Sequence, residues 1–345
     1  MTLPDNDAQF PALDMAALAA LDSQIDGQIL RGEERLTLAE LSERTGWTPD
    51  ELQQLWLWAG LPVLEDEDVY TIEDVEGLNG LRQYDQEQQF DKQAMSSLIR
   101  SIGSSVERMA VWQVENLVQH LIRSRGLGDT AARLEAARYA PAQADMIGFL
   151  VEKIWRRHYA AAIHRVTTEA VLRRGVSDDD KEFPLIITAG FINIVNFNEI
   201  VAGFTPTEYA DYVQDFHDHV SDVVNAAGGR VIKHMGDFVL FGAARPDQGA
   251  DLALKILEVA HEYSPADVQI GLVSCRVTTR YGDIYAPAIN DALLLSREAP
   301  PGGLLVDQDT ARMLARHPRF ELESQPQIEI KSHNKVDAIK VTYAP

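Results

Sequence analysis

The sequence predicts two domains, a helical domain over residues 1–175 followed by an α/β domain over residues 176–345. A chain of 345 residues is long enough to build two separate cores. The first part is rich in Ala, Leu, Gln, Glu and Arg with few β-branched runs, and strand-like segments begin only after it. Between the two parts, the run 175–180 contains glycine, serine and three aspartates, which is typical of a domain boundary.

Charge and composition narrow the class of protein. The formal net charge of −22 argues against a main surface that binds nucleic acid or anionic lipid, because both repel acidic faces. No run approaches the ~20 apolar residues of a membrane span, and no signal segment opens the chain. The only cysteine, Cys275, excludes an internal disulfide and a cysteine-rich metal site. We therefore expect a cytoplasmic protein whose polar first residues, 1–7, are frayed.

Residues 35–82 form the first recognisable unit of the helical domain. Two helical segments flank Thr45-Gly46-Trp47, and the acidic run 65–68 precedes a further segment at 70–75. This order resembles the helix-turn-helix with a short wing of mercury-resistance-type regulators. The stretch contains three Arg, no Lys and eleven Asp or Glu, so a DNA duplex would repel it. We expect a structural or protein-contact role, with a DNA-reading regulator as the alternative.

Residues 91–174 predict a helical bundle. Apolar residues between Ser101 and Arg125 recur close to the spacing of one helical face. A last helix over about 142–174 leads into the boundary and would couple the two domains mechanically. It contains His158 and His164, which titrate near neutrality when unperturbed and could report pH; the alternative is that both are ordinary surface or interface residues.

Strand-like and helical segments alternate in the second half of the chain. This alternation predicts an α/β sandwich. The strand-like segments are 185–187, 231–232, 238–241, 268–273 and 304–306, and the helical ones are 206–227, 249–263 and 290–297.

The residues that carry chemistry gather in this second half. Lys233 is followed by Gly236-Asp237, and Gly282-Asp283 and Asn290 come later. A lysine donor, carboxylate oxygens and an amide are the groups that could seat a purine triphosphate together with a metal ion. Each residue alone would mean little, because Gly-Asp pairs are common in turns and a lone lysine is usually a solvated charge.

The types and spacing of these residues together resemble those in the catalytic domain of class III adenylyl cyclases. No insertion or deletion interrupts it from Phe191 to the run 299–304. The resemblance implies a ferredoxin-like α/β domain that works as a dimer, with ATP and two Mg²⁺ or Mn²⁺ ions at the interface. It implies that Lys233 and Asp283 read adenine, that Asp237 holds metal, and that Asn290 orients the ribose.

Two positions depart from the family pattern. Asn193 stands where the family has its other metal-binding aspartate, and a neutral amide attracts a hard divalent cation less strongly. Leu294 stands where the family keeps an arginine for the α-phosphate, and Arg297 is a poor stand-in because it lies three residues further on. Loss of one such transition-state contact costs about 10²–10³ in rate. Cys275 and Ala286 also replace usual glycines and could tighten the pocket.

The helical half resembles, more loosely, the regulatory half of certain actinobacterial cyclases. That resemblance implies a proton or a fatty acid as effector and favours His158 and His164 as pH-sensing residues. Two functions stay open: a nucleotide-binding pseudocyclase or very weak cyclase regulated by its N-terminal domain, and an active adenylyl cyclase that converts ATP to cAMP and pyrophosphate. The partner chain would be a second copy or a related cyclase.

Overall fold

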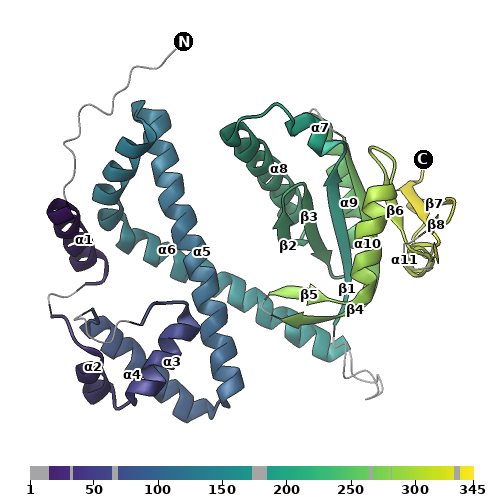
Figure 1. Ribbon diagram of the computed structural model, residues 1–345. Helices are drawn as coiled ribbons and strands as arrows, with labels where there is room; N and C mark the ends of the chain where they lie inside the picture. Colours follow the sequence, from purple (N-terminus) through teal and green to yellow (C-terminus); the bar gives the residue numbers. More distant parts are fainter. Residues whose placement is uncertain are drawn as a thin grey trace. The chain divides into compact units, whose positions relative to one another are not determined.

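The chain forms two compact units, Met1–Thr168 and Glu169–Pro345, in the computed structural model (Figure 1). The structure describes residues 15–31, 34–63, 69–172, 185–263, 267–280, 282–329 and 335–345. Three of the expectations above therefore lie outside the described residues: the frayed start at 1–7, the acidic run 65–68 and the boundary run 175–180. Each unit is described by itself.

The described part of the first unit begins with four helices. They are α1 (Met15–Ile29), α2 (Leu38–Thr45), α3 (Pro49–Ala59) and α4 (Ile72–Gln88). Helices α2, α3 and α4 each begin after a threonine whose hydroxyl accepts a hydrogen bond from the backbone N–H three residues on. The acidic side chain of that later residue accepts a hydrogen bond from the backbone N–H of the threonine. These capping boxes satisfy backbone N–H groups that a helix start would otherwise leave unpaired. The three threonines are Thr37, Thr48 and Thr71.

A small core holds α2, α3 and α4 together. Leu36 and Tyr70 form an isolated antiparallel bridge, and both side chains are buried among leucines of the three helices. Helices α2 and α3 end at Gly46 and Gly60, whose positive φ angles of 70° and 78° favour glycine. The leucines of this core are Leu38, Leu41, Leu52, Leu55 and Leu78.

Two long helices follow α4 in the described part of the chain, and the second of them ends beyond Thr168. Helix α5 (Lys92–Arg125) packs on α6 (Asp129–Leu172) through Val118, Leu121 and two alanines of α6. The connecting helix expected over about 142–174 is thus the later part of α6, which begins at Asp129. Pro141, just before that expected start, lies inside the helix, where its missing N–H removes one backbone hydrogen bond. None of the helices described is both long and apolar enough to cross a membrane.

The second unit is built on a mixed sheet in the strand order β2-β3-β1-β4-β6-β10-β7. All neighbours pair antiparallel except β4 and β6, which pair parallel. The short strand β5 (Asp283–Tyr285) folds back onto the end of β4, and β8 (Ile328–Glu329) pairs with β9 (Lys335–Val336) in a separate ribbon. The strands of the main sheet are β1 (Leu185–Ile194), β2 (Arg230–Met235), β3 (Phe238–Ala243), β4 (Val268–Arg280), β6 (Leu304–Val306), β7 (Phe320–Ser324) and β10 (Ile339–Tyr343).

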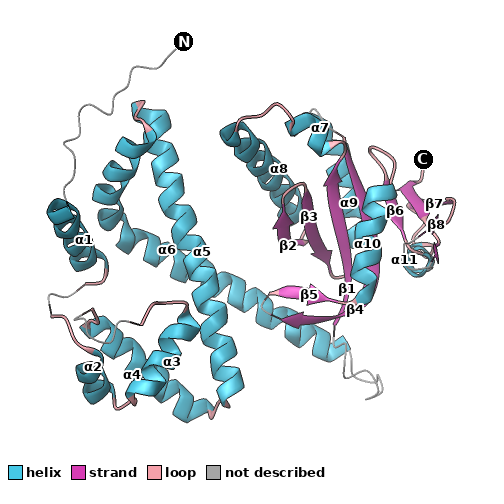
Figure 2. Cartoon of the chain, viewed as in Figure 1, coloured by secondary structure: helices cyan, strands magenta, loops and turns pink. Residues whose placement is uncertain are grey.

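Helices cover both faces of this sheet (Figure 2). Successive side chains of a strand point to opposite faces, so Ile192 packs with α8 (Pro206–Ala226) and α9 (Pro246–Tyr263), while Phe191 packs with α10 (Pro287–Glu298). The short helices α7 (Phe197–Val201) and α11 (Gln308–Leu314) add to the first face. The predicted combination of a helical region with an α/β domain is confirmed.

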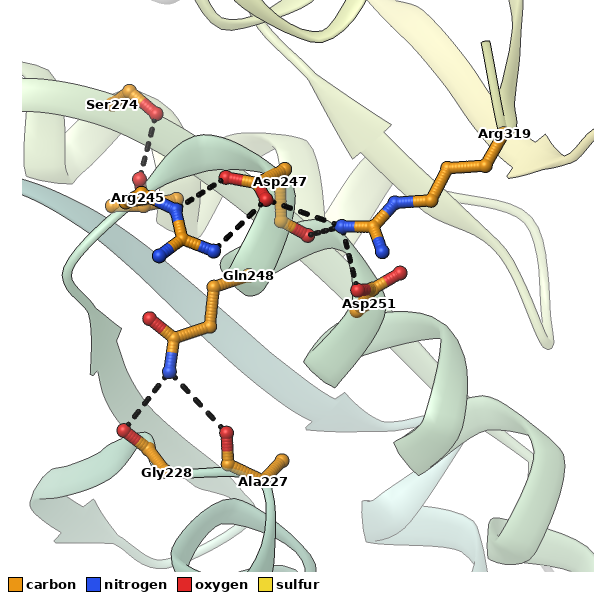
Figure 3. Close-up of polar contacts among 9 residues, drawn as sticks. Ala227, Gly228, Arg245, Asp247, Gln248, Asp251, Ser274 and Arg319 are labelled. Atoms are coloured by element: carbon orange, nitrogen blue, oxygen red, sulfur yellow. Dashed lines mark hydrogen bonds and ion pairs between the residues drawn. The ribbon is translucent and has the colours of Figure 1, made fainter. Parts of the chain in front are cut away.

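Ion pairs fix the start of α9 in the second unit (Figure 3). Arg245 donates to both carboxylate oxygens of Asp247 at 3.0 and 3.1 Å. From the loop before β7, Arg319 reaches Asp247 at 3.2 Å and Asp251 at 2.7 Å. Gln248 donates to the Gly228 carbonyl at 3.0 Å. These contacts tie α9 to the turn before β2 and to β7, and so support the sheet from which the candidate site is built.

Candidate nucleotide site

Lys233 and Asp283 form a direct ion pair. Lys233 lies on β2 and Asp283 begins β5, and β5 reaches the lysine because Asp283 pairs with Arg280 at the end of β4. Lys233 Nζ donates to Asp283 Oδ2 at 2.6 Å, and this bond raises the lysine pKa. The other carboxylate oxygen of Asp283 accepts the Ile284 N–H at 2.9 Å. The structure therefore joins the two residues expected to read adenine, with a donor and an acceptor side by side.

Asp237 lies in the two-residue turn between β2 and β3. Gly236 occupies the left-handed region at φ 59°, as such tight hairpin turns require, and the Asp237 carbonyl accepts the Ile194 N–H at 3.2 Å. Burial raises the pKa of the Asp237 carboxyl, while its own backbone N–H and the charge of Arg297 act in the opposite direction. The turn thus places Asp237 at the end of β1.

Asn193 lies at that same end of β1. It pairs in register with Phe238 on one side and with Gln269 on the other, and is only 7% exposed. Its Oδ1 atom is buried without a hydrogen-bond partner. The two positions expected to hold metal are therefore close in the fold, but one of them is a neutral amide.

The donor set does not fit the pair of divalent ions that the family resemblance implies. Within the described ranges, no group of three or more His, Cys, Asp and Glu side chains is arranged to hold a metal ion. Asp237 supplies a single carboxylate, Asn193 supplies an amide oxygen, and a cationic side chain, Arg297, acts on the same carboxylate. Hard divalent cations prefer several anionic oxygens, so this arrangement is a weak metal site.

Helix α10 carries the remaining predicted residues. Asn290 and Leu294 lie one turn apart on it, and Asn290 is exposed while Leu294 is half-buried. Asn290 lines an open pocket of about 450 Å³ between the N-terminal turn of α10 and the β4–β5 hairpin. Ala286 lines it too; the other lining residues are Thr278, Ile284, Tyr285, Pro287 and Ile289. Burial raises the pKa of the Cys275 thiol to about 11, and Cys275 is not among the lining residues.

The sequence reasoning missed a pair of histidines beside the site. His217 on α8 and His234 on β2 have ring centroids 4.5 Å apart. His217 Nε2 donates to the Gly236 carbonyl at 2.8 Å, and His234 Nε2 lies 3.1 Å from Ser221 Oγ. Burial and the neighbouring His217 lower the pKa of His234, and Asp218 opposes this shift. Only the packing of α8 on the hairpin brings these histidines together, so spacing in the sequence gives no signal.

The depressed pKa of His234 predicts loss of stability on acidification. The unfolded chain binds a proton near pH 6.5 and the folded chain resists it, so stability should fall as the pH drops below about 6.5. Hydrogen exchange of the second unit at about pH 7.5 and about pH 5.5 would measure this. His234→Gln should flatten the difference, whereas His317→Gln, in the same unit but outside the pair, should leave it. An unchanged difference in His234→Gln would contradict the assignment.

The two histidines first singled out lie elsewhere. His158 and His164 are on α6, in the first unit, and both are exposed. The His164 carbonyl accepts the Thr167 hydroxyl at 2.9 Å, and nearby Trp155 stacks on Tyr159 with ring centroids 5.0 Å apart. Their role in sensing stays a prediction.

Residues 185–343 match the sequence profile of the adenylate and guanylate cyclase catalytic domain. This part of the chain is thus similar to the class III nucleotidyl cyclases. An adenylate cyclase of Glutamicibacter nicotianae is 29% identical over 326 residues, which are 92% of this chain and 81% of that protein. An adenylate cyclase of Streptomyces coelicolor is 27% identical over 314 residues, 91% of this chain and 79% of that protein.

Solved structures give weaker likenesses. The guanylate cyclase domain of RhGC from Catenaria anguillulae in complex with GTP is 19% identical and covers 47% of this chain and 98% of its own, with a TM-score of 0.43. The adenylyl cyclase CyaB from P. aeruginosa is 16% identical and covers 46% of this chain and 95% of its own, with a TM-score of 0.40.

Proposed function

We propose that the second unit binds ATP or a related adenine nucleotide and cyclises it very slowly or not at all, as a pseudocyclase. The observation that carries the proposal is the contrast between two groups of residues. Lys233 and Asp283 are paired at 2.6 Å and present a donor and an acceptor. Two groups that the family uses for cyclisation are missing, because Asn193 supplies no charge and Leu294 supplies no hydrogen-bond donor.

An active adenylyl cyclase that uses Mn²⁺ or Mg²⁺ is the second candidate. It is favoured by the two relatives named adenylate cyclase, whose similarity extends over about nine tenths of the chain, including the helical unit. Such an enzyme would have to work with Asn193 and Leu294 as they stand. Both candidate functions include regulation by a proton or a fatty acid that binds to the first unit.

The finer architecture belongs to this proposal as well. The order β1-α8-β2-β3-α9-β4, with β2-β3-β1-β4 adjacent in the sheet, supports a ferredoxin-like arrangement. The pair α2 and α3 joined through Gly46, with the bridge between Leu36 and Tyr70, supports a winged-helix-like segment. In a dimer, this chain would contribute Lys233 and Asp283 to a site completed by a second copy or by a related cyclase.

Lys233→Ala tests the binding proposal directly. A hydrogen bond from a charged donor contributes about 1.5–3 kcal/mol, so ATP affinity should fall about tenfold to hundredfold. Isothermal titration of the full chain with ATP and with GTP measures the affinity and the choice of base. Lys255→Ala is the matched control, because Lys255 is an exposed lysine on α9. Equal affinities in both variants, or no ATP binding by the unmodified chain, would refute the proposal.

A further inference from the structure

Arg297 lies against the turn that carries Asp237. It is an exposed residue in the last turn of α10, and its guanidinium carbon is 5.1 Å from the centre of the Phe238 ring. Phe238 directly follows Asp237 in the chain. A guanidinium over an aromatic ring is held there by the negative face of the ring. The Arg297 side chain is therefore positioned at the β2–β3 turn of its own chain.

The Arg297 backbone is tied to the same end of the sheet. Its carbonyl accepts a hydrogen bond from Gln269 Nε2 at 3.4 Å, and Gln269 pairs in register with Asn193 on β1. On the other side, Asn193 pairs in register with Phe238. Contacts of neighbouring residues therefore hold three side chains at the same end of the sheet, those of Asn193, Asp237 and Arg297.

The charges of these three residues cancel. Asp237 contributes one negative charge, Arg297 one positive charge and Asn193 none. Two carboxylates without a metal ion would repel a triphosphate, whereas a neutral group of residues that includes a guanidinium would not. Arginine also binds phosphate oxygens through two parallel N–H groups. A neutral asparagine and a nearby arginine therefore both favour the binding of phosphate groups at this end of the sheet.

We propose that the Arg297 guanidinium takes the place of the divalent cation at this end of the sheet, so that the triphosphate of a nucleotide is bound without a metal ion. The inference rests on the proposed nucleotide binding and adds to it how the phosphates are held. No bond is made or broken in this step. Arg297 serves as a fixed monovalent cation, and Asn193 keeps the site free of a second negative charge.

ATP binding in EDTA and in Mg²⁺ tests the inference on the full chain. The unmodified protein should bind ATP with about equal affinity in both, because the cation is part of the chain. Arg297→Gln should weaken binding in EDTA about tenfold or more. Arg312→Gln, an exposed arginine of α11 that pairs with Asp309, should leave binding unchanged. Binding that requires Mg²⁺ in the unmodified protein, or equal binding by Arg297→Gln in EDTA, would overturn the inference.

Direct binding of Mn²⁺, followed by electron paramagnetic resonance without nucleotide, separates this inference from the proposed function. The unmodified chain should leave Mn²⁺ free, and the variant Asn193→Asp/Arg297→Gln should bind it, because the local charge changes from neutral to two negative charges. If ATP fails to bind under every condition, the nucleotide proposal fails, and the Mn²⁺ result still decides whether Arg297 replaces the cation. Mn²⁺ bound by the unmodified chain, or left free by the double variant, would contradict the replacement.

Discussion

Asn193→Asp combined with Leu294→Arg is expected to raise cAMP formation from ATP by at least about 10²-fold over the unmodified chain. The first change returns a carboxylate to the end of β1 beside the Asp237 turn, and the second places a guanidinium one turn beyond Asn290 on α10. Both are groups that the family resemblance assigns to the reaction. Production of cAMP is measured with Mg²⁺ and with Mn²⁺ at about pH 5.5 and about pH 8, the range over which an unperturbed histidine titrates.

The single substitutions are the controls for this gain. Groups that act on one chemical step are not additive, so each single variant should recover much less than the pair. Adding Arg297→Gln should raise the rate further, because Arg297 offsets the charge of Asp237. A folded double variant that forms no more cAMP than the unmodified chain would contradict the account of the two missing groups.

Gly271→Ala is expected to displace α10 and to destabilise the second unit by about 1–3 kcal/mol or more. Gly271 lies on β4 where α10 crosses the sheet, and a Cβ atom there would come within 2.1 Å of the Ala292 carbonyl oxygen and 2.3 Å of the Ser296 nitrogen. Both are backbone atoms, so the whole helix must move. Asn290 and Arg297 would move with it, and nucleotide binding should weaken as well.

Hydrogen exchange of α10 measures this change. The five tryptophans of the chain all precede residue 175, so their fluorescence would report on the first unit only. Gly203→Ala is the control, since a Cβ atom at Gly203 would meet nothing within 4 Å. If Gly271→Ala and Gly203→Ala show the same hydrogen exchange of α10 and the same stability against urea, the close packing of α10 on β4 is contradicted.

The central strands and the three longer helices of the second unit were predictable because their patterns are strong, whereas the short elements α7, α11 and β5 and the strands β7 to β10 were not predicted. Runs such as 238–241 and 268–273 lie within β3 and β4, and the amphipathic segment 206–227 is α8 but for its last residue. Helix α6 begins at Asp129, earlier than the expected start at about 142, and it continues through Pro141. Boundaries of this kind depend on packing more than on local sequence.

The candidate site was predictable only in part, for a related reason. The resemblance supplied Lys233 and Asp283, and the structure brings them together. The contact between Arg297 and Phe238 depends on how α10 crosses the sheet, and the histidine pair depends on how α8 packs on the hairpin. Neither follows from spacing along the chain, because each joins separate elements whose relative placement is set by the cores of the sheet.

The measurement that tests the central claim most directly is turnover of bound ATP by the unmodified chain. Protein at a concentration that binds most of the added ATP is incubated with Mg²⁺ or Mn²⁺, and bound ATP and cAMP are measured in the same sample. The account predicts saturable binding, weakened by Lys233→Ala, with cAMP formed at least about 10²-fold more slowly than by Asn193→Asp/Leu294→Arg. Formation of cAMP by the unmodified chain as fast as by that variant would contradict it and establish an active adenylyl cyclase.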